Sequence, residues 1–164
     1  MKNEILIDLL DPPIVVGLEN VEIMTNIGKG NAKLTLLDDK LYFDDREVKV
    51  GKYPFSSIDE DSTITGLDVI QYVRDQGNEL YWQLLNYKIL ETLIANPELF
   101  PENLKQDFKG NPIWIALLGT TYLNPADDNK ECVSFMGWFE NNLVQCHIVL
   151  EDKWQPELLF AYVE

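Results

Sequence analysis

The stretch AKLTLLDDKLYFDDREVKV, residues 32–50, carries the clearest structural pattern in this sequence. Its apolar runs at 32–37, 41–43 and 47–50 are separated by two aspartate-rich triplets. Aspartate is common in turns because its side chain accepts hydrogen bonds from nearby backbone N–H groups. The strict alternation of polar and apolar residues in 47–50 indicates a strand with one buried and one solvated face. The stretch therefore predicts a meander of short strands joined by turns.

The last third of the chain predicts four more strands, at residues 113–123, 132–140, 143–151 and 158–163. Turn residues bound each of these runs. The two-residue link Asn141-Asn142 matches a tight hairpin turn, which needs left-handed backbone angles that asparagine tolerates. We therefore expect one contiguous antiparallel meander in which 132–140 pairs with 143–151.

The region between these two parts has a helical pattern. A first helix is expected to open at Thr65, and a second, stronger one to cover residues 79–93. The second carries two apolar stripes, with Leu85 on one of them, and is expected to end at Asn96, before a proline. An order of strands, helices and strands without βαβ alternation predicts the α+β class. The expected fold is an antiparallel sheet of N-terminal strands and the C-terminal meander, packed against central helices.

A single domain covering residues 1–164 is expected, because no stretch rich in glycine, proline or serine separates these regions. The surface of this domain must carry a large charge, since 28 acidic residues face 13 basic ones and the net charge is −15. The 18 aromatic residues, 4 Trp, 7 Tyr and 7 Phe, argue against a disordered acidic chain. Such a domain repels nucleic acids and anionic membranes and attracts a basic protein.

Motifs for catalysis or metal binding are missing from the sequence. His147 is the only histidine, and its neighbour Cys146 points to the other face of the same predicted strand. With Cys132, these residues lack the paired spacing of a zinc site. The acidic run 59–61 lacks the glycine and glutamate that complete a calcium loop. No metal or cofactor is expected, and both cysteines are expected to be buried, reduced thiols of a cytoplasmic protein.

These observations favour a binding protein over an enzyme. We expect an acidic inhibitor of the immunity or antitoxin type, which neutralises a basic toxin such as a nuclease by occlusion. The expected contacts are turn carboxylates and two tryptophans: Asp38, Asp39, Asp44, Asp45, Asp127, Asp128, Trp138, Glu151, Asp152 and Trp154. Two alternatives stay open. One is a DNA mimic, which needs carboxylates in rows, and the other is a small enzyme whose carboxylates and His147 line a pocket.

Overall fold

A computed structural model describes residues 3–9, 15, 18–26, 31–51, 64–75, 85–154 and 158–163 of the chain. Ten strands lie in these residues: β1 (Asn3–Asp8), β2 (Glu22–Asn26), β3 (Asn31–Leu37), β4 (Lys40–Phe43), β5 (Arg46–Gly51), β6 (Trp114–Ala116), β7 (Thr120–Asn124), β8 (Lys130–Phe139), β9 (Asn142–Val149) and β10 (Leu158–Val163). The described helices are α1 (Gly66–Asp75), α3 (Tyr87–Ala95) and three short 3-10 helices, η1 (Pro97–Leu99), η2 (Glu102–Leu104) and η3 (Pro125–Asp127).

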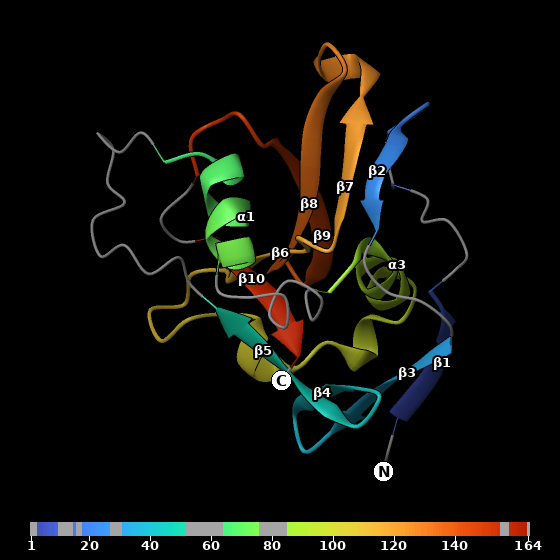
Figure 1. Cartoon of the computed structure of the whole chain (residues 1–164). Coiled ribbons are helices and arrows are strands. Elements are labelled where there is room, and N and C mark those ends of the chain that lie inside the picture. Colours follow the sequence, from blue (N-terminus) through green and yellow to red (C-terminus); the bar gives the residue numbers. More distant parts are fainter. Residues whose placement is uncertain are drawn as a thin grey trace.

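All ten strands belong to one sheet, in the order β1-β3-β4-β5-β10-β6-β8-β7-β2 (Figure 1). β6 and β7 pair with different parts of one edge of β8, and β9 pairs with the other edge. Neighbours are antiparallel, except that β10 runs parallel to β6. The α+β class is therefore the right coarse description. A layer of central helices is wrong, because the described residues form a large sheet with only two α-helices.

The N-terminal meander is confirmed. β3 pairs with β4 and β4 pairs with β5, both antiparallel. The two connecting turns place Asp38 and Asp39 at φ 51° and 58°, and Asp44 and Asp45 at φ 50° and 65°. Two consecutive left-handed residues match the right-handed twist of the strands that they join, and aspartate tolerates this conformation better than most residues.

The C-terminal meander is confirmed only in part. β8 and β9 form the expected hairpin, but the left-handed turn residues are Glu140 and Asn141, one position earlier than expected. The predicted strand 113–123 is divided into β6 and β7 by a turn at residues 117–119. β10 does not continue the meander beside β9, because it lies between β5 and β6. The expectation of one contiguous antiparallel meander is therefore wrong.

The helix start predicted at Thr65 is confirmed by its capping contacts. The backbone N–H of Thr65 donates to Asp68 at 2.9 Å, and the N–H of Asp68 donates to the Thr65 hydroxyl at 3.3 Å. This reciprocal pair satisfies N–H groups at the start of α1 that have no partner within the helix. The start of α1 lies beside the end of β9, since the N–H of Leu67 donates to the carbonyl of Leu150 at 3.0 Å.

The second helix is shorter than expected. The part of the prediction before residue 85 lies outside the described residues, and Leu85 and Asn86 are not helical. Asn86 is instead the N-cap of α3, and its side chain accepts a hydrogen bond from the N–H of Lys88 at 3.0 Å. Asn96 caps the other end, directly before the proline, as predicted.

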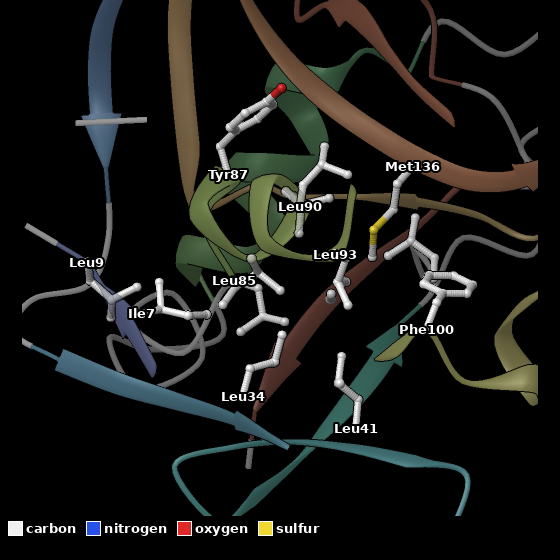
Figure 2. Packing of buried hydrophobic residues seen from close by; sticks show 14 of the residues in the cluster. Ile7, Leu9, Leu34, Leu41, Leu85, Tyr87, Leu90, Leu93, Phe100 and Met136 are labelled. Atoms are coloured by element: carbon white, nitrogen blue, oxygen red, sulfur yellow. The ribbon is translucent and has the colours of Figure 1, made fainter. Parts of the chain in front are cut away.

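Two apolar cores form on opposite faces of the sheet. One contains α3 together with buried residues of β1, β3, β4, β6, β7, β8 and β10, and Figure 2 shows Leu34, Leu41, Leu90, Leu93 and Met136 converging in it. The other contains Val69, Ile70 and Val73 of α1 with Ala116, Val133, Leu150 and Trp154. Successive residues of β6, β8 and β10 contribute to the two cores in alternation, as the pleat of a strand requires.

No helix in the described part of the chain is long and apolar enough to span a membrane.

Candidate functional site

The turn carboxylates predicted to contact a partner fall into two separate groups. Asp38 and Asp39 lie in the β3–β4 turn, with Asp44 and Asp45 in the β4–β5 turn, in the lower part of Figure 1. The second group surrounds the turn between β7 and β8, at the top of that view. The two groups therefore lie at opposite ends of the molecule and do not form one continuous surface.

Two aspartates of the first group stabilise the fold through their carboxylates. Asp39 accepts hydrogen bonds from the backbone N–H groups of Glu102 at 2.6 Å and Asn103 at 3.0 Å, which attaches the β3–β4 turn to η2. Asp44 accepts from the N–H of Lys33 at 2.7 Å. Asp45 is exposed and pairs with the Lys33 ammonium at 3.3 Å. Only part of this group is thus available to a partner.

The second group forms what we call the acidic end: Asp127, Asp128, Glu131, Glu151 and Asp152. The β8–β9 pairing brings the start of β8 next to the end of β9, since Cys132 pairs with Val149 and the N–H of Leu150 donates to the carbonyl of Glu131 at 2.8 Å. Lys130 lies 3.8 Å from Glu151 across this junction. Five carboxylates thus share one end of the sheet, and the cations in the same segments are Lys130 and Lys153.

Asp127 is the most engaged carboxylate of the acidic end. Its Oδ2 lies 3.0 Å from Nε2 of His147, accepts from Nδ2 of Asn124 at 2.8 Å and lies 3.9 Å from Sγ of Cys132. The β8–β9 register explains this meeting, because Cys132, Ser134 and His147 point to the same face of the sheet. Neither the predicted turn nor the lone histidine indicated this cluster in the sequence.

The cluster does not hold an activated nucleophile. Cys132 is fully buried, and burial, with the nearby Asp127 carboxylate, raises the pKa of its thiol from 9.0 to about 11. A thiol in this state is protonated at neutral pH and is a poor nucleophile. The other cysteine, Cys146, is exposed, contrary to the expectation that both are buried, and its side chain points to the opposite face from His147.

The two tryptophans predicted to contact a partner lie in different environments. Trp154 is 1% exposed and packs in the core beside α1, so the expectation that it faces a partner is wrong. Trp138 is half-buried near the end of β8. Its ring stacks on Phe100 with a centroid distance of 5.9 Å, and the Lys105 ammonium lies 3.9 Å from the ring centroid.

Trp138 also lines a cavity of about 520 Å³, which we call the aromatic cleft. The β8–β9 turn supplies Phe139, Glu140 and Asn141, and the segment after η1 supplies the rest of the lining: Glu102, Lys105, Gln106, Gly110 and Pro112. Phe139 is 47% exposed, and Phe108, between Gln106 and Gly110, is 95% exposed. Except for Trp138, none of these residues was among the predicted contacts. The signal in the sequence is a phenylalanine inside Asp107-Phe108-Lys109-Gly110-Asn111, where turn residues surround it.

Comparisons of the chain with protein-family models, with curated proteins and with solved structures found no match. In the described part of the chain, no group of three or more histidine, cysteine or acidic side chains is arranged to hold a metal ion.

Proposed function

We propose that this protein is an acidic binding protein that neutralises a basic partner by occlusion, as an immunity or antitoxin-type inhibitor of a toxin such as a nuclease does. The observation that carries the proposal is the net charge of −15 on a folded chain. Solubility requires a net charge of magnitude only about 2–8 for a small domain. Charge beyond this speeds association with a cationic surface and disfavours association with nucleic acid.

The acidic end supports the proposal because its carboxylates gather from two segments of the chain. Asp128 and Glu131 follow η3, and Glu151 and Asp152 follow β9. Asp128, Glu151 and Asp152 are exposed, so their charges act on an approaching protein with little rearrangement. Asp127 contributes less, because its carboxylate is already bonded to His147 and Asn124.

A DNA mimic and a carboxylate enzyme receive less support. The two groups of turn carboxylates are at opposite ends of the molecule, whereas a mimic needs carboxylates in rows (Figure 1). The enzyme alternative needs His147 and carboxylates that line a pocket, and His147 is not among the residues that line the aromatic cleft. We therefore do not adopt either alternative as the proposed function.

The first test is capture of the partner from the native cell at low and at high salt. We expect a strongly basic protein at one-to-one stoichiometry. Its association should slow steeply as salt rises, because the field of exposed charges is screened over about 10 Å at roughly 0.1 M. The association rate of the purified pair is then measured for the variant Asp128→Asn, Glu151→Gln, Asp152→Asn. Its matched control, Glu4→Gln, Asp8→Asn, Glu98→Gln, removes the same charge at exposed residues outside the predicted contacts.

The first triple variant should slow association several-fold more than the control, because steering depends on charge close to the contact surface. Equal slowing by both variants would remove the acidic end from the proposal. Recovery of a small molecule, or of no basic protein at any salt, would overturn the proposed function itself.

A further inference from the structure

The loop that carries Phe108 is closed by hydrogen bonds of Asp107 and presents the phenylalanine side chain to solvent. The Asp107 carboxylate accepts from the backbone N–H groups of Lys109 at 2.8 Å and Asn111 at 2.9 Å. The N–H of Asp107 donates to the carbonyl of Asn111 at 2.8 Å, and that of Gly110 donates to the carbonyl of Asp107 at 3.0 Å. The hydrogen bond from the Asn111 N–H, with that from Lys109, favours the charged form and holds the pKa of Asp107 below its usual value. A large apolar side chain that is exposed to solvent is typical of a protein–protein interface, where the partner buries it.

The wall of the aromatic cleft already binds a cation. The Lys105 ammonium lies over the Trp138 ring and 2.5 Å from a carboxylate oxygen of Glu102. The Lys105 side chain is only 18% exposed, whereas Glu102 is 77% exposed. An ammonium is retained in such a place because the face of the indole and the carboxylate replace its water. Phe139 and Glu140, one aromatic and one acidic residue, line the same cleft as this lysine.

The position at Phe139 and Glu140 is open to a partner. Phe139 is 47% exposed, Glu140 is exposed, and both line the cleft. Both residues lie at the tight turn of the β8–β9 hairpin, where Phe139 pairs with Asn142 and the backbone of Glu140 is left-handed. A planar guanidinium suits this position better than an ammonium, because it stacks on a ring while it donates two parallel hydrogen bonds to a carboxylate.

We propose that the aromatic cleft is a contact site for an arginine on the surface of a basic protein, with Phe108 covered at the edge of the same contact. This inference rests on the proposed function, because it assumes a basic partner. It adds the residues that keep the partner bound: the acidic end speeds the encounter, and Phe108, Phe139 and Glu140 slow the dissociation. Contacts with aromatic side chains at the centre of an interface commonly carry most of its binding energy.

The site is tested with an oligo-arginine peptide as the probe and amide NMR spectra of the full chain as the readout. We expect shifts at Phe108, Gly110, Phe139 and Glu140 and at the Trp138 indole N–H. At high salt the shifts at Phe108, Phe139 and Trp138 should persist, because contacts with aromatic rings also bury apolar surface, which salt does not screen. Shifts at Asp128, Glu151 and Asp152 should disappear at high salt, because exposed charges are screened. An oligo-lysine peptide of the same length should shift the cleft resonances much less.

Two variants test the same contact by affinity. Phe139→Ala with Glu140→Gln should weaken peptide binding at high salt about tenfold, and Phe108→Ala should weaken binding of the captured partner by a similar factor. The matched control is Leu6→Ala, which removes a side chain that is 78% exposed on β1. Equal melting temperatures for all variants show that the fold is unchanged.

Three results would overturn the cleft assignment. Peptide shifts confined to the acidic end would do so and would leave the proposed function standing. An equal response to oligo-lysine would remove arginine as the occupant. Shifts of the cleft resonances with the concentration of the protein alone would show that a second copy of this chain covers the face. Failure to capture any basic partner, with no peptide shift anywhere, would instead overturn the proposed function.

Discussion

The backbone N–H of Gly119 donates a hydrogen bond to the carbonyl oxygen of Leu85 at 2.9 Å. The N–H of Leu85 in turn donates to the carbonyl of Ala161 at 3.1 Å. Leu85, the residue before the N-cap of α3, therefore links β10 to the turn between β6 and β7. These two hydrogen bonds attach the start of α3 to the sheet. The same turn separates β6, which pairs with β10, from β7, which pairs with β2.

Replacing Gly119 with alanine should lower the free energy of unfolding by about 1–3 kcal/mol. A Cβ atom at this position would lie 2.7 Å from the backbone carbon and oxygen of Leu85, and backbone atoms cannot move aside as a flexible side chain can. The control is Gly110→Asn, because nothing lies within 4 Å of that site and asparagine tolerates its φ of 83°. Urea unfolding measures both, and equal values would contradict the packing argument.

Leu85→Asp should abolish cooperative unfolding or leave the chain unfolded. The side chain is 3% exposed, and Figure 2 shows it directed into the core beneath α3 with Leu34 and Leu93 nearby. An aspartate there buries a charge without a partner, which is among the most destabilising changes known. Leu67→Asp is the control, since Leu67 is 47% exposed in the first turn of α1, where a negative charge is favourable. An unchanged melting temperature for Leu85→Asp would contradict this assignment.

Sequence patterns predicted the local elements better than their arrangement. The aspartate turns, the capping contact of Thr65 and the β8–β9 hairpin depend on residues close in the chain, and all three were predictable. The place of β10 was not, because an apolar run such as 158–163 pairs equally well with any strand whose edge is open. Leu85 falls on the apolar stripe of a helix in sequence, but its backbone hydrogen bonds to Gly119 and Ala161 take precedence over helical propensity.

In the candidate site too, the sequence predicted local structure but not which residues come together. Acidic turns were predictable as turns, but only the β8–β9 register shows that Asp128 and Glu151 share one end of the sheet. Trp154 has polar neighbours in sequence, Lys153 and Gln155, and Trp138 stands between Gly137 and Phe139, yet Trp154 is in the core and Trp138 lines a cleft. Burial depends on contacts with residues distant in the chain, which composition does not specify.

One thiol should react quickly in the native protein and the other should not. Cys146 is exposed and should be modified by a thiol reagent at neutral pH, whereas the buried Cys132 should be modified only on unfolding.

The raised pKa of Cys132 also predicts how the free energy of unfolding depends on pH. Below pH 9 the thiol is protonated in both states, and between pH 9 and about 11 only the unfolded state loses the proton, so stability should fall as pH rises through this window.

The control for this titration is Cys132→Ala, which should remove the alkaline loss of stability that the thiol causes, while Cys146→Ala should retain it. The number of cysteines that the reagent modifies, measured before and after denaturation, checks the reactivity. Modification of both cysteines in the native state at equal rates would show that the start of β8 is open to solvent.

Tyr122 and Ser134 should be coupled in stability. The phenol and hydroxyl oxygens are 2.7 Å apart in the core, and burial raises the pKa of Tyr122. Tyr122→Phe or Ser134→Ala alone should cost about 1–2 kcal/mol, because each leaves one buried polar group without its partner. The double variant should cost less than the sum of the two, and a double-mutant cycle in urea measures the difference. Additive losses would show that the hydrogen bond contributes little.

Asp127 and Asp128 are adjacent in the chain but should respond differently to the same change. Asp127 accepts hydrogen bonds from His147 and Asn124, and its side chain and that of His147 are each 32% exposed. Asp127→Asn should therefore lower the free energy of unfolding by about 1 kcal/mol. Asp128 is exposed at φ 56°, a conformation that asparagine also adopts, so Asp128→Asn should change stability by less than about 0.5 kcal/mol. The association rate with a basic partner should show the reverse order, with the larger loss at Asp128. An equal cost in stability for the two variants would show that the Asp127–His147 contact does not stabilise the acidic end.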